Sequence, residues 1–419
     1  MSVSALGAIL ALVVAIVLIL KKVPPTYAMI AGAITGGLIG GAGLANTVIY
    51  MIDGTKDIVS AIIRIVAAGV LAGALIKSGA AARIANSIVE KLGDKNSLLA
   101  MTLATWLLTA IGVFGDVAVI TVSPIAIQIA QKTGYKKLGI LLAMIGGVKA
   151  GNVMSPNPNG IAAAETFHVP LTSMMAAGIP AALTAIVITT IFAKSLAYKG
   201  TEVMADSQGA DTAMLPSLGS ALIGPIVTIL LLLLRPIAGI TIDPLIALPV
   251  GGLVGMAVMG KMKDIVSYLE FGLEKMSGVA MLLIGTGTLA GIIANSTLKD
   301  VIVNLLQKAG LPGFLLAPIS GTLMGAASAS STAGTTLASQ IFGETILSYG
   351  VAALAAGAMI HAGSFVFDGL PHGSFFHVSA GSVNMKIDER LKLIAYESII
   401  GFCMVAVSTI VYGVIKIAG

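Results

Sequence analysis

The sequence predicts an all-α polytopic membrane protein, because its composition and its apolar runs both fit a chain that crosses a bilayer many times. Of its 419 residues, 57% are hydrophobic and 10% are charged, and the mean hydropathy is +1.01. A water-soluble chain of this length would need far more charge to cover its surface. Apolar runs of about 17 to 25 residues recur along the chain, each long enough to cross a bilayer as a helix. We therefore expect the lipid bilayer as a partner and the cytoplasmic (inner) membrane as the location.

The first apolar run, Ser4 to Leu20, predicts a transmembrane helix that is retained. No basic segment precedes it and no small-residue cleavage site follows it, so a removed signal peptide is the weaker interpretation. The single cysteine, Cys403, lies in the last apolar run, which excludes an intrachain disulfide and a thiolate metal site. We expect neither a metal nor a cofactor, since no nucleotide-binding motif is present.

The basic residues predict the orientation of the chain. Assigning the loops in order places about sixteen of the 24 Lys and Arg on one side, among them Lys137 and Arg390, and the positive-inside rule makes that side the cytoplasm. Both termini are then expected outside. The net charge of +5 reflects this topology, and we expect no nucleic-acid partner.

The chain carries the signs of an internal repeat on either side of a polar linker, residues 201–217, which we place in the cytoplasm. In each half, Leu-Ala-Gly is followed by an amphipathic stretch that ends in Lys-x-Gly. Further on, Ala-Met-Ile opens a segment rich in Pro and Gly, and Phe-His-Val follows. An odd number of spans per half, about five, makes the second half enter from the opposite face. We interpret residues 1–200 and 218–419 as two inverted repeats.

Two kinds of interruption recur in the halves. The stretches "AIGVFGDVAVITVSP" and "GTLMGAASASSTAGTT" are rich in Gly, Ser and Thr, and we interpret them as tips of re-entrant helical hairpins at about 98–131 and 311–346. The Pro- and Gly-containing segments predict broken helices at about 139–168 and 351–380. Remaining spans would form a scaffold, which we expect to dimerise.

The segment "SPNPNG" explains why a broken helix points to a binding site. Irregular backbone in hydrocarbon leaves amide and carbonyl groups unpaired, at a cost of several kcal/mol per group, so it persists where protein, water or a ligand satisfies it. Pro156 and Pro158 each remove a donor, while asparagines can bond stray backbone groups or a guest. A proline kink satisfied by neighbouring helices is the alternative interpretation.

Polar and ionisable residues near the interruptions are the candidate site, because charge at membrane depth is costly and marks function. Asp116, at the first tip, and Asp368 are candidate ion-coupling residues, since a carboxyl group can bind and release a proton. No catalytic residue is expected. The candidate substrate-binding residues are Lys149, Asn152, Ser155, Asn157, Asn159, Gly160, Ser328, Ser330, Ser331, Thr332, His372 and Ser374.

Three of these assignments have structural alternatives. Asp116 could cap its hairpin, and Lys149 could form an internal ion pair with Glu165 or Asp116 instead of binding a substrate carboxylate. The hydroxyl residues of "SASSTAG" could pack helices instead of binding a ligand. Arg64 lies on a predicted scaffold span, where we expect a structural role.

At these residues the sequence resembles the gluconate permease family. "KSGAAARIANSIVEKLG" is similar to that family's small-residue segment and amphipathic helix, "VFGDVAVITVSPI" to its Phe-x-Glu-Val-Gly-Phe stretch, and "SPNPNGIAAAETF" to its proline-rich segment. The hairpins and broken helices also resemble the wider ion-transporter superfamily, whose sodium-coupled members have Ser-Asn-Thr tips. Two departures are that Asp116 replaces the family's Glu and that Lys149 lies near the position of a family His.

The resemblance implies proton-coupled symport of gluconate or a related hydroxy acid. Alternating access between the two faces of the membrane is the expected mechanism, and the chain is not expected to be an enzyme. A cation/proton antiporter or a sodium-coupled carboxylate symporter is the alternative. An intramembrane protease is a more distant one, because the signatures H-E-x-x-H and G-x-S-G are missing.

Overall fold

The fold is taken from a computed structural model of the chain. The structure describes residues 2–56, 58–93, 96–203, 215–298, 300, 301, 304, 308, 312–371 and 373–417, apart from the side chains of Leu20, Arg235 and Pro236. Within these residues the chain is helical and forms no strand beyond a single bridge between Val3 and Ser296. The predicted all-α class is therefore confirmed.

The helices follow one another with short connections. The first half of the chain contains α1 (Ala5–Leu20), α2 (Pro25–Ile39), α3 (Gly43–Lys56), α4 (Val59–Lys77), α5 (Ala80–Leu92), α6 (Ser97–Ala110), α7 (Gly115–Thr133), α8 (Lys137–Asn152), α9 (Pro158–Thr166), α10 (Leu171–Ala177) and α11 (Ile179–Leu196). The second half contains α12 (Leu218–Ala238), α13 (Pro244–Val258), α14 (Ile265–Ala294), α16 (Leu316–Ser328), α17 (Ser331–Ser348), α18 (Ala353–Gly363), α19 (Ser374–Ser382), α20 (Ile387–Arg390) and α21 (Ile394–Thr409). Short 3₁₀ turns lie at Met262–Asp264, Gly313–Leu315 and Leu391–Leu393, and a π turn, Ile410–Val414, continues α21.

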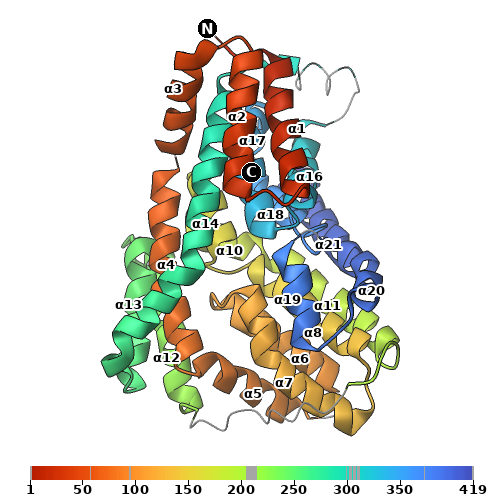
Figure 1. Ribbon diagram of the computed structural model, residues 1–419. Helices are drawn as coiled ribbons and strands as arrows, with labels where there is room; N and C mark the ends of the chain where they lie inside the picture. The colour runs from red at the N-terminus through yellow and green to blue at the C-terminus, as the bar shows by residue number, and fades with distance from the viewer. Residues whose placement is uncertain are drawn as a thin grey trace.

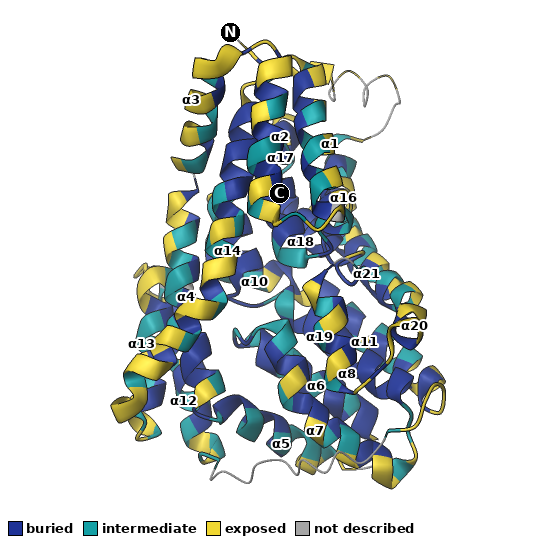
Figure 2. Ribbon diagram, in the orientation of Figure 1, coloured by how far each residue is buried: buried dark blue, intermediate teal, exposed yellow. Residues whose placement is uncertain are grey.

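Several of these helices have the length and composition of membrane spans. Among the described residues, four segments are long and apolar enough to cross a bilayer: Val59–Lys77, Leu171–Leu196, Met262–Ala294 and Ile387–Val414. Large apolar side chains also face outward, such as Leu6 on α1 (63% exposed) and Leu183 on α11 (58% exposed). Figure 2 shows such exposed positions along the outer helices. An apolar exterior fits a chain surrounded by lipid.

The long helix α14 packs against α4 and α3, which follow each other down one side of the molecule (Figure 1). Glycines allow the backbones to touch: a Cβ atom at Gly54 would lie 2.5 Å from the backbone nitrogen of Gly291, and one at Gly69 would lie 2.8 Å from the carbonyl oxygen of Gly272. Gly252 of α13 approaches α4 in the same way. We call α3, α4, α13 and α14 the frame. Small residues at such contacts are typical of tightly packed membrane helices.

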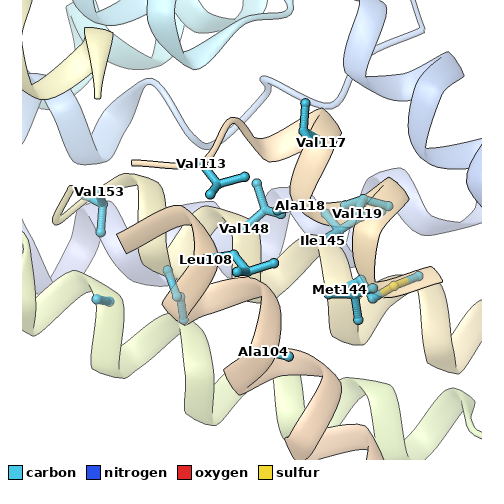
Figure 3. Close-up of a cluster of buried hydrophobic side chains, with 14 of the residues drawn as sticks. Ala104, Leu108, Val113, Val117, Ala118, Val119, Met144, Ile145, Val148 and Val153 are labelled. Atoms are coloured by element: carbon cyan, nitrogen blue, oxygen red, sulfur yellow. The ribbon is translucent and has the colours of Figure 1, made fainter. Parts of the chain in front are cut away.

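A second bundle, formed by α6, α7, α8 and α11, surrounds α8. Residues 137–151 of α8 are all buried. Figure 3 shows part of its core, where Leu108 of α6, Val117 of α7 and Val148 of α8 lie in one hydrophobic cluster. This bundle positions the first of two interruptions described below.

Candidate functional site

Two helices stop and restart inside the protein. α8 ends at Asn152 and α9 begins at Pro158, and α18 ends at Gly363 while α19 begins at Ser374. We call residues 153–157 the first break and residues 364–373 the second break. Each break leaves helix-terminal backbone groups that need partners.

The first break is satisfied by its own amides. The Asn157 side-chain oxygen accepts a hydrogen bond from the Gly160 amide (3.2 Å) and so caps α9, while its Nδ2 donates to Asn152 Oδ1 (3.0 Å). Ser155 Oγ donates to the Asn152 carbonyl oxygen (3.3 Å). These side chains are therefore engaged with the backbone in this structure, and a guest molecule would have to compete for them.

Two short turns separate the paired helices on either side of the breaks. Residues 111–114 connect α6 to α7, and Ala329 and Ser330 connect α16 to α17. Ala329 has a positive φ of 46°, an uncommon conformation for a residue with a Cβ atom. The Ser330 side chain caps α17 by accepting from the Ala333 amide (3.3 Å), and Ser328 Oγ donates to the Ser330 carbonyl oxygen (3.2 Å).

Asn159 joins the first break to the second turn. Its Nδ2 donates to Ser331 Oγ (3.2 Å), and its Oδ1 accepts from Thr332 Oγ1 (2.6 Å). Residues 172 and 173 positions apart are thus held by one amide side chain. The starts of α9 and α17 meet at this contact.

The starts of α7 and α19 lie next to the same region. A Cβ atom at Gly373 would lie 2.3 Å from the Ala329 carbonyl oxygen, so the second break touches the second turn. A Cβ atom at Gly115 would lie 3.4 Å from Asn152 Nδ2 and 3.7 Å from Phe375 Cε2. We call the meeting point of the first residues of α7, α9, α17 and α19 the candidate site. Helix N-termini present free N–H groups and partial positive charge, which favours anions.

Lys149 is buried, with 1% of its surface exposed, and it reaches across to the second break. Its ammonium group forms an ion pair with Asp368 and donates to the Phe365 carbonyl oxygen (2.6 Å). Neither partner considered from the sequence, Glu165 or Asp116, is the one found. The pair connects the two halves of the chain, and Asp368 is likewise buried.

Asp116 occupies the first turn of α7 and is half-buried. Its carboxylate accepts from the Val117 amide (2.9 Å), which is a local contact at the helix start. Ser374 is the first residue of α19 and is exposed, while Gly160 is buried in the first turn of α9. His372 lies outside the described residues.

A buried ion pair next to the second break was missed by the sequence reasoning. Arg390, fully buried, pairs with Glu397, donates to Ser379 Oγ (3.0 Å) and stacks on the Phe376 ring (4.7 Å to its centre). A Cβ atom at Gly369 would lie 2.3 Å from the Glu397 carboxylate. Arg390 was expected on a cytoplasmic loop, and the seven-residue spacing to Glu397, two helical turns, was the available signal.

Lys137 was also expected on that loop, but it is buried. It donates to the Asn384 carbonyl oxygen (2.6 Å). Two of the basic residues assigned to the cytoplasmic side thus hold the protein together instead of covering a loop.

Arg64 of α4 connects the frame to α9. Its guanidinium group makes two hydrogen bonds to the Asp243 carboxylate (2.9 and 2.7 Å) and one to Glu165 (2.8 Å), which Ser60 also contacts (2.9 Å). This agrees with the structural role expected for Arg64. Within the described part of the chain, no group of three or more His, Cys, Asp or Glu is placed to hold a metal ion.

The comparison with known proteins decides the family. A family model for "GntP family permease" matches residues 3–415. The chain belongs to the GntP permease family. GntP permeases are transporters and not enzymes, so this chain is a transporter, integral to the inner membrane.

Relatives of this GntP permease agree with that assignment. An uncharacterized transporter of Haemophilus influenzae is 58% identical over 99% of both chains. The gluconate permease of Pseudomonas aeruginosa is 25% identical over 79% of this chain and 80% of its own, and the D-serine transporter DsdX of Escherichia coli is 24% identical over 77% and 79%. The solved YdaH transporter of Alcanivorax borkumensis has the same fold, with a TM-score of 0.66, 16% identity and coverage of 90% of this chain and 89% of that chain.

Proposed function

We propose that this GntP permease is a secondary active symporter that carries a small organic acid, such as a gluconate-like sugar acid or another hydroxy acid. The observation that carries the proposal is the contact of Asn159 with Ser331 and Thr332, at the point where four helices begin. Gluconate and D-serine, named for two relatives, share a carboxylate and a hydroxyl group. The substrate class of the family is therefore compatible with a site made of helix N-termini, hydroxyls and an amide.

The candidate site offers both groups of such a substrate a partner. The carboxylate would lie against free N–H groups at the helix starts, where the helix dipoles favour negative charge. The substrate hydroxyl would replace one of the hydrogen bonds that Asn159 now makes with Ser331 or Thr332. Lys149 is engaged with Asp368, so we assign it to holding the second break rather than to binding the carboxylate.

The proposed transport cycle uses two inverted repeats, residues 1–200 and 218–419. The helices α6 with α7 and α16 with α17 act as re-entrant hairpins, and they move with the two broken helices as one unit. The frame belongs to the scaffold, whose dimerisation we also propose. Labelling of cysteines introduced at Lys136 and Lys308 from opposite sides of the membrane would support the inversion, whereas access from one side would refute it.

We propose that a proton drives transport through Asp116. Its carboxylate is half-buried, makes a single local backbone contact and is not engaged in an ion pair among the described residues, in contrast to Asp368. Sodium is the competing coupling ion, because the hydroxyls of Ser328 to Thr332 and neighbouring carbonyl groups are oxygen ligands.

The test is uptake into proteoliposomes. An inward proton gradient in sodium-free buffer should drive accumulation of the correct acid from a panel of aldonates, glycerate, lactate, D-serine and dicarboxylates. Asp116→Asn should abolish accumulation while exchange of labelled for unlabelled substrate persists. Uptake that requires sodium and ignores the proton gradient would replace the proton with sodium, and sodium or lithium movement without any organic acid would indicate an antiporter.

A further inference from the structure

A cavity of about 350 Å³ separates the frame from the helices that start at the candidate site. Its walls come from α3, α4 and α14 on one side and from α9 and α17 on the other. Helices α14 and α17 lie side by side in the upper part of the molecule (Figure 1). Tight glycine contacts fill the interior of the frame, so this cavity marks a more loosely packed interface.

One hydroxyl group in the cavity wall has no partner. Ser339 on α17 is fully buried, and its Oγ makes no hydrogen bond with any described residue. Next to it, Gln340 Nε2 donates to Thr166 Oγ1 (2.9 Å), which leaves the Gln340 amide oxygen as an acceptor. A buried hydroxyl without a partner is rare, because leaving it unsatisfied costs about 1–3 kcal/mol. A bound species with which it can interact would remove that cost.

The charge of the cavity wall is negative. Glu165 and Glu344 line it, and no Lys or Arg does so among the described residues. Arg64 contacts Glu165 from a neighbouring cavity of about 180 Å³, but Asp243 shares that guanidinium group. These four side chains together carry two positive-charge deficits. Helix α9 also ends at Thr166, so its negative dipole end lies at the cavity.

The cavity and the candidate site lie at opposite ends of the same two helices. Asn159 contacts Thr332 where α9 and α17 begin, and Thr166 contacts Gln340 seven and eight residues later. At a helical rise of 1.5 Å per residue, the two contacts are about 10 to 12 Å apart. A cation in the cavity would therefore sit near the site without occupying it.

We propose that this cavity binds a monovalent cation, sodium or a hydrated proton, with oxygen atoms from Ser339, Gln340, Glu165 and Glu344. Its role as a reservoir for the coupling cation rests on the proposed symport, but cation binding itself does not. Negative walls that exclude water in part raise the local concentration of a cation and repel a free carboxylate. The organic acid and the cation would thus approach the candidate site by different routes.

The first experiment measures binding without transport. Purified protein is heated in sodium chloride, lithium chloride or N-methylglucamine chloride at equal ionic strength, and its unfolding midpoint is recorded. Sodium should raise the midpoint of the wild type, and Ser339→Ala and Glu344→Gln should each reduce that increase. Glu270→Gln, which removes an equal charge from an exposed position on α14, is the matched control and should keep it.

The second experiment covers the proton. If sodium shifts no midpoint, the proton concentration for half-maximal uptake should rise about threefold in Glu344→Gln, and the difference should shrink at high salt as screening increases. Glu270→Gln should leave it unchanged. The absence of both effects would overturn the cation site. Sodium binding lost in Ser339→Ala without any cation-driven uptake would support the site and refute the symport.

Discussion

The first and second breaks interrupt helices of similar character but obtain their stability in different ways. In the first break, Asn157 and Asn152 bond each other and the local backbone. In the second, an ammonium group from the other half of the chain, Lys149, pairs with Asp368 and binds the Phe365 carbonyl oxygen. The first break is thus stabilised locally, whereas the second depends on a charge brought in by the fold.

The difference is visible at matching positions of the two halves. Counting from Ala-Met-Ile, the seventh residue is Lys149 in the first half and Ser364 in the second. Ser364 shares a hydrogen bond with Thr335 (2.8 Å) and donates to the His361 carbonyl oxygen (2.7 Å), all within its own half. A neutral hydroxyl at one position and a long cation at the other show that the halves have divided the work: only the first reaches across with charge. Variants should therefore affect the second break more severely.

The largest effect is expected from Lys149→Met. Removing one partner of a buried ion pair leaves Asp368 as an uncompensated charge, which typically costs about 3–5 kcal/mol. The variant should show poor membrane insertion and a strongly lowered unfolding temperature in detergent. The double variant Lys149→Met with Asp368→Leu removes both charges and should recover much of the loss.

A different result for Lys149→Met would change its assignment. A protein that unfolds at the wild-type temperature but needs at least about tenfold more substrate for half-maximal uptake would show that the ammonium group binds the substrate. Lys149 would then belong to the candidate site and not to the support of the second break.

A smaller effect is expected from Gly373→Ala. The new Cβ atom would lie 2.3 Å from the Ala329 carbonyl oxygen, so the second break and the second turn must separate, at a cost of about 1–3 kcal/mol. Substrate affinity should fall with stability because both elements border the candidate site. Gly381→Ala, on the same helix with no atom within 4 Å, is the control. Equal behaviour of the two variants would remove this contact from the account.

The smallest of the stability effects is expected from Asn157→Ala in the first break. Loss of the cap on α9 should cost about 1 kcal/mol, which thermal unfolding can measure. Asn157→Asp keeps an oxygen acceptor for the Gly160 amide and should lose less. If Asn157→Ala were as damaging as Lys149→Met, the contrast between the two breaks would be wrong.

Local residue types account for the part of the molecule that could be predicted. Apolar runs fixed the all-α membrane class, and Pro156, Pro158 and Asn157 are residues that stop one helix and cap the next. Which distant side chains meet could not be predicted in this way. Asp368 lies 219 residues from Lys149, and nothing in either neighbourhood names the other.

Charges that end up buried were the other limit of sequence reasoning. Arg390 looks like a loop residue because it stands between Lys386 and Lys392. Its burial follows from the packing of α20, α21 and Phe376, which the sequence does not reveal. The cavity beside Ser339 likewise depends on how the frame meets α9 and α17.

The central claim is that the acid binds where α9 and α17 begin, and binding to Asn159→Asp tests it most directly. The substitution keeps the shape of the side chain but adds a negative charge beside Ser331 and Thr332. Calorimetric titration with the acid identified by uptake should show affinity lowered at least about tenfold, because the two carboxylates repel. Asn46→Asp on α3, whose amide bonds only its own helix (3.1 Å), should bind as the wild type does. Unchanged affinity in Asn159→Asp would contradict the site.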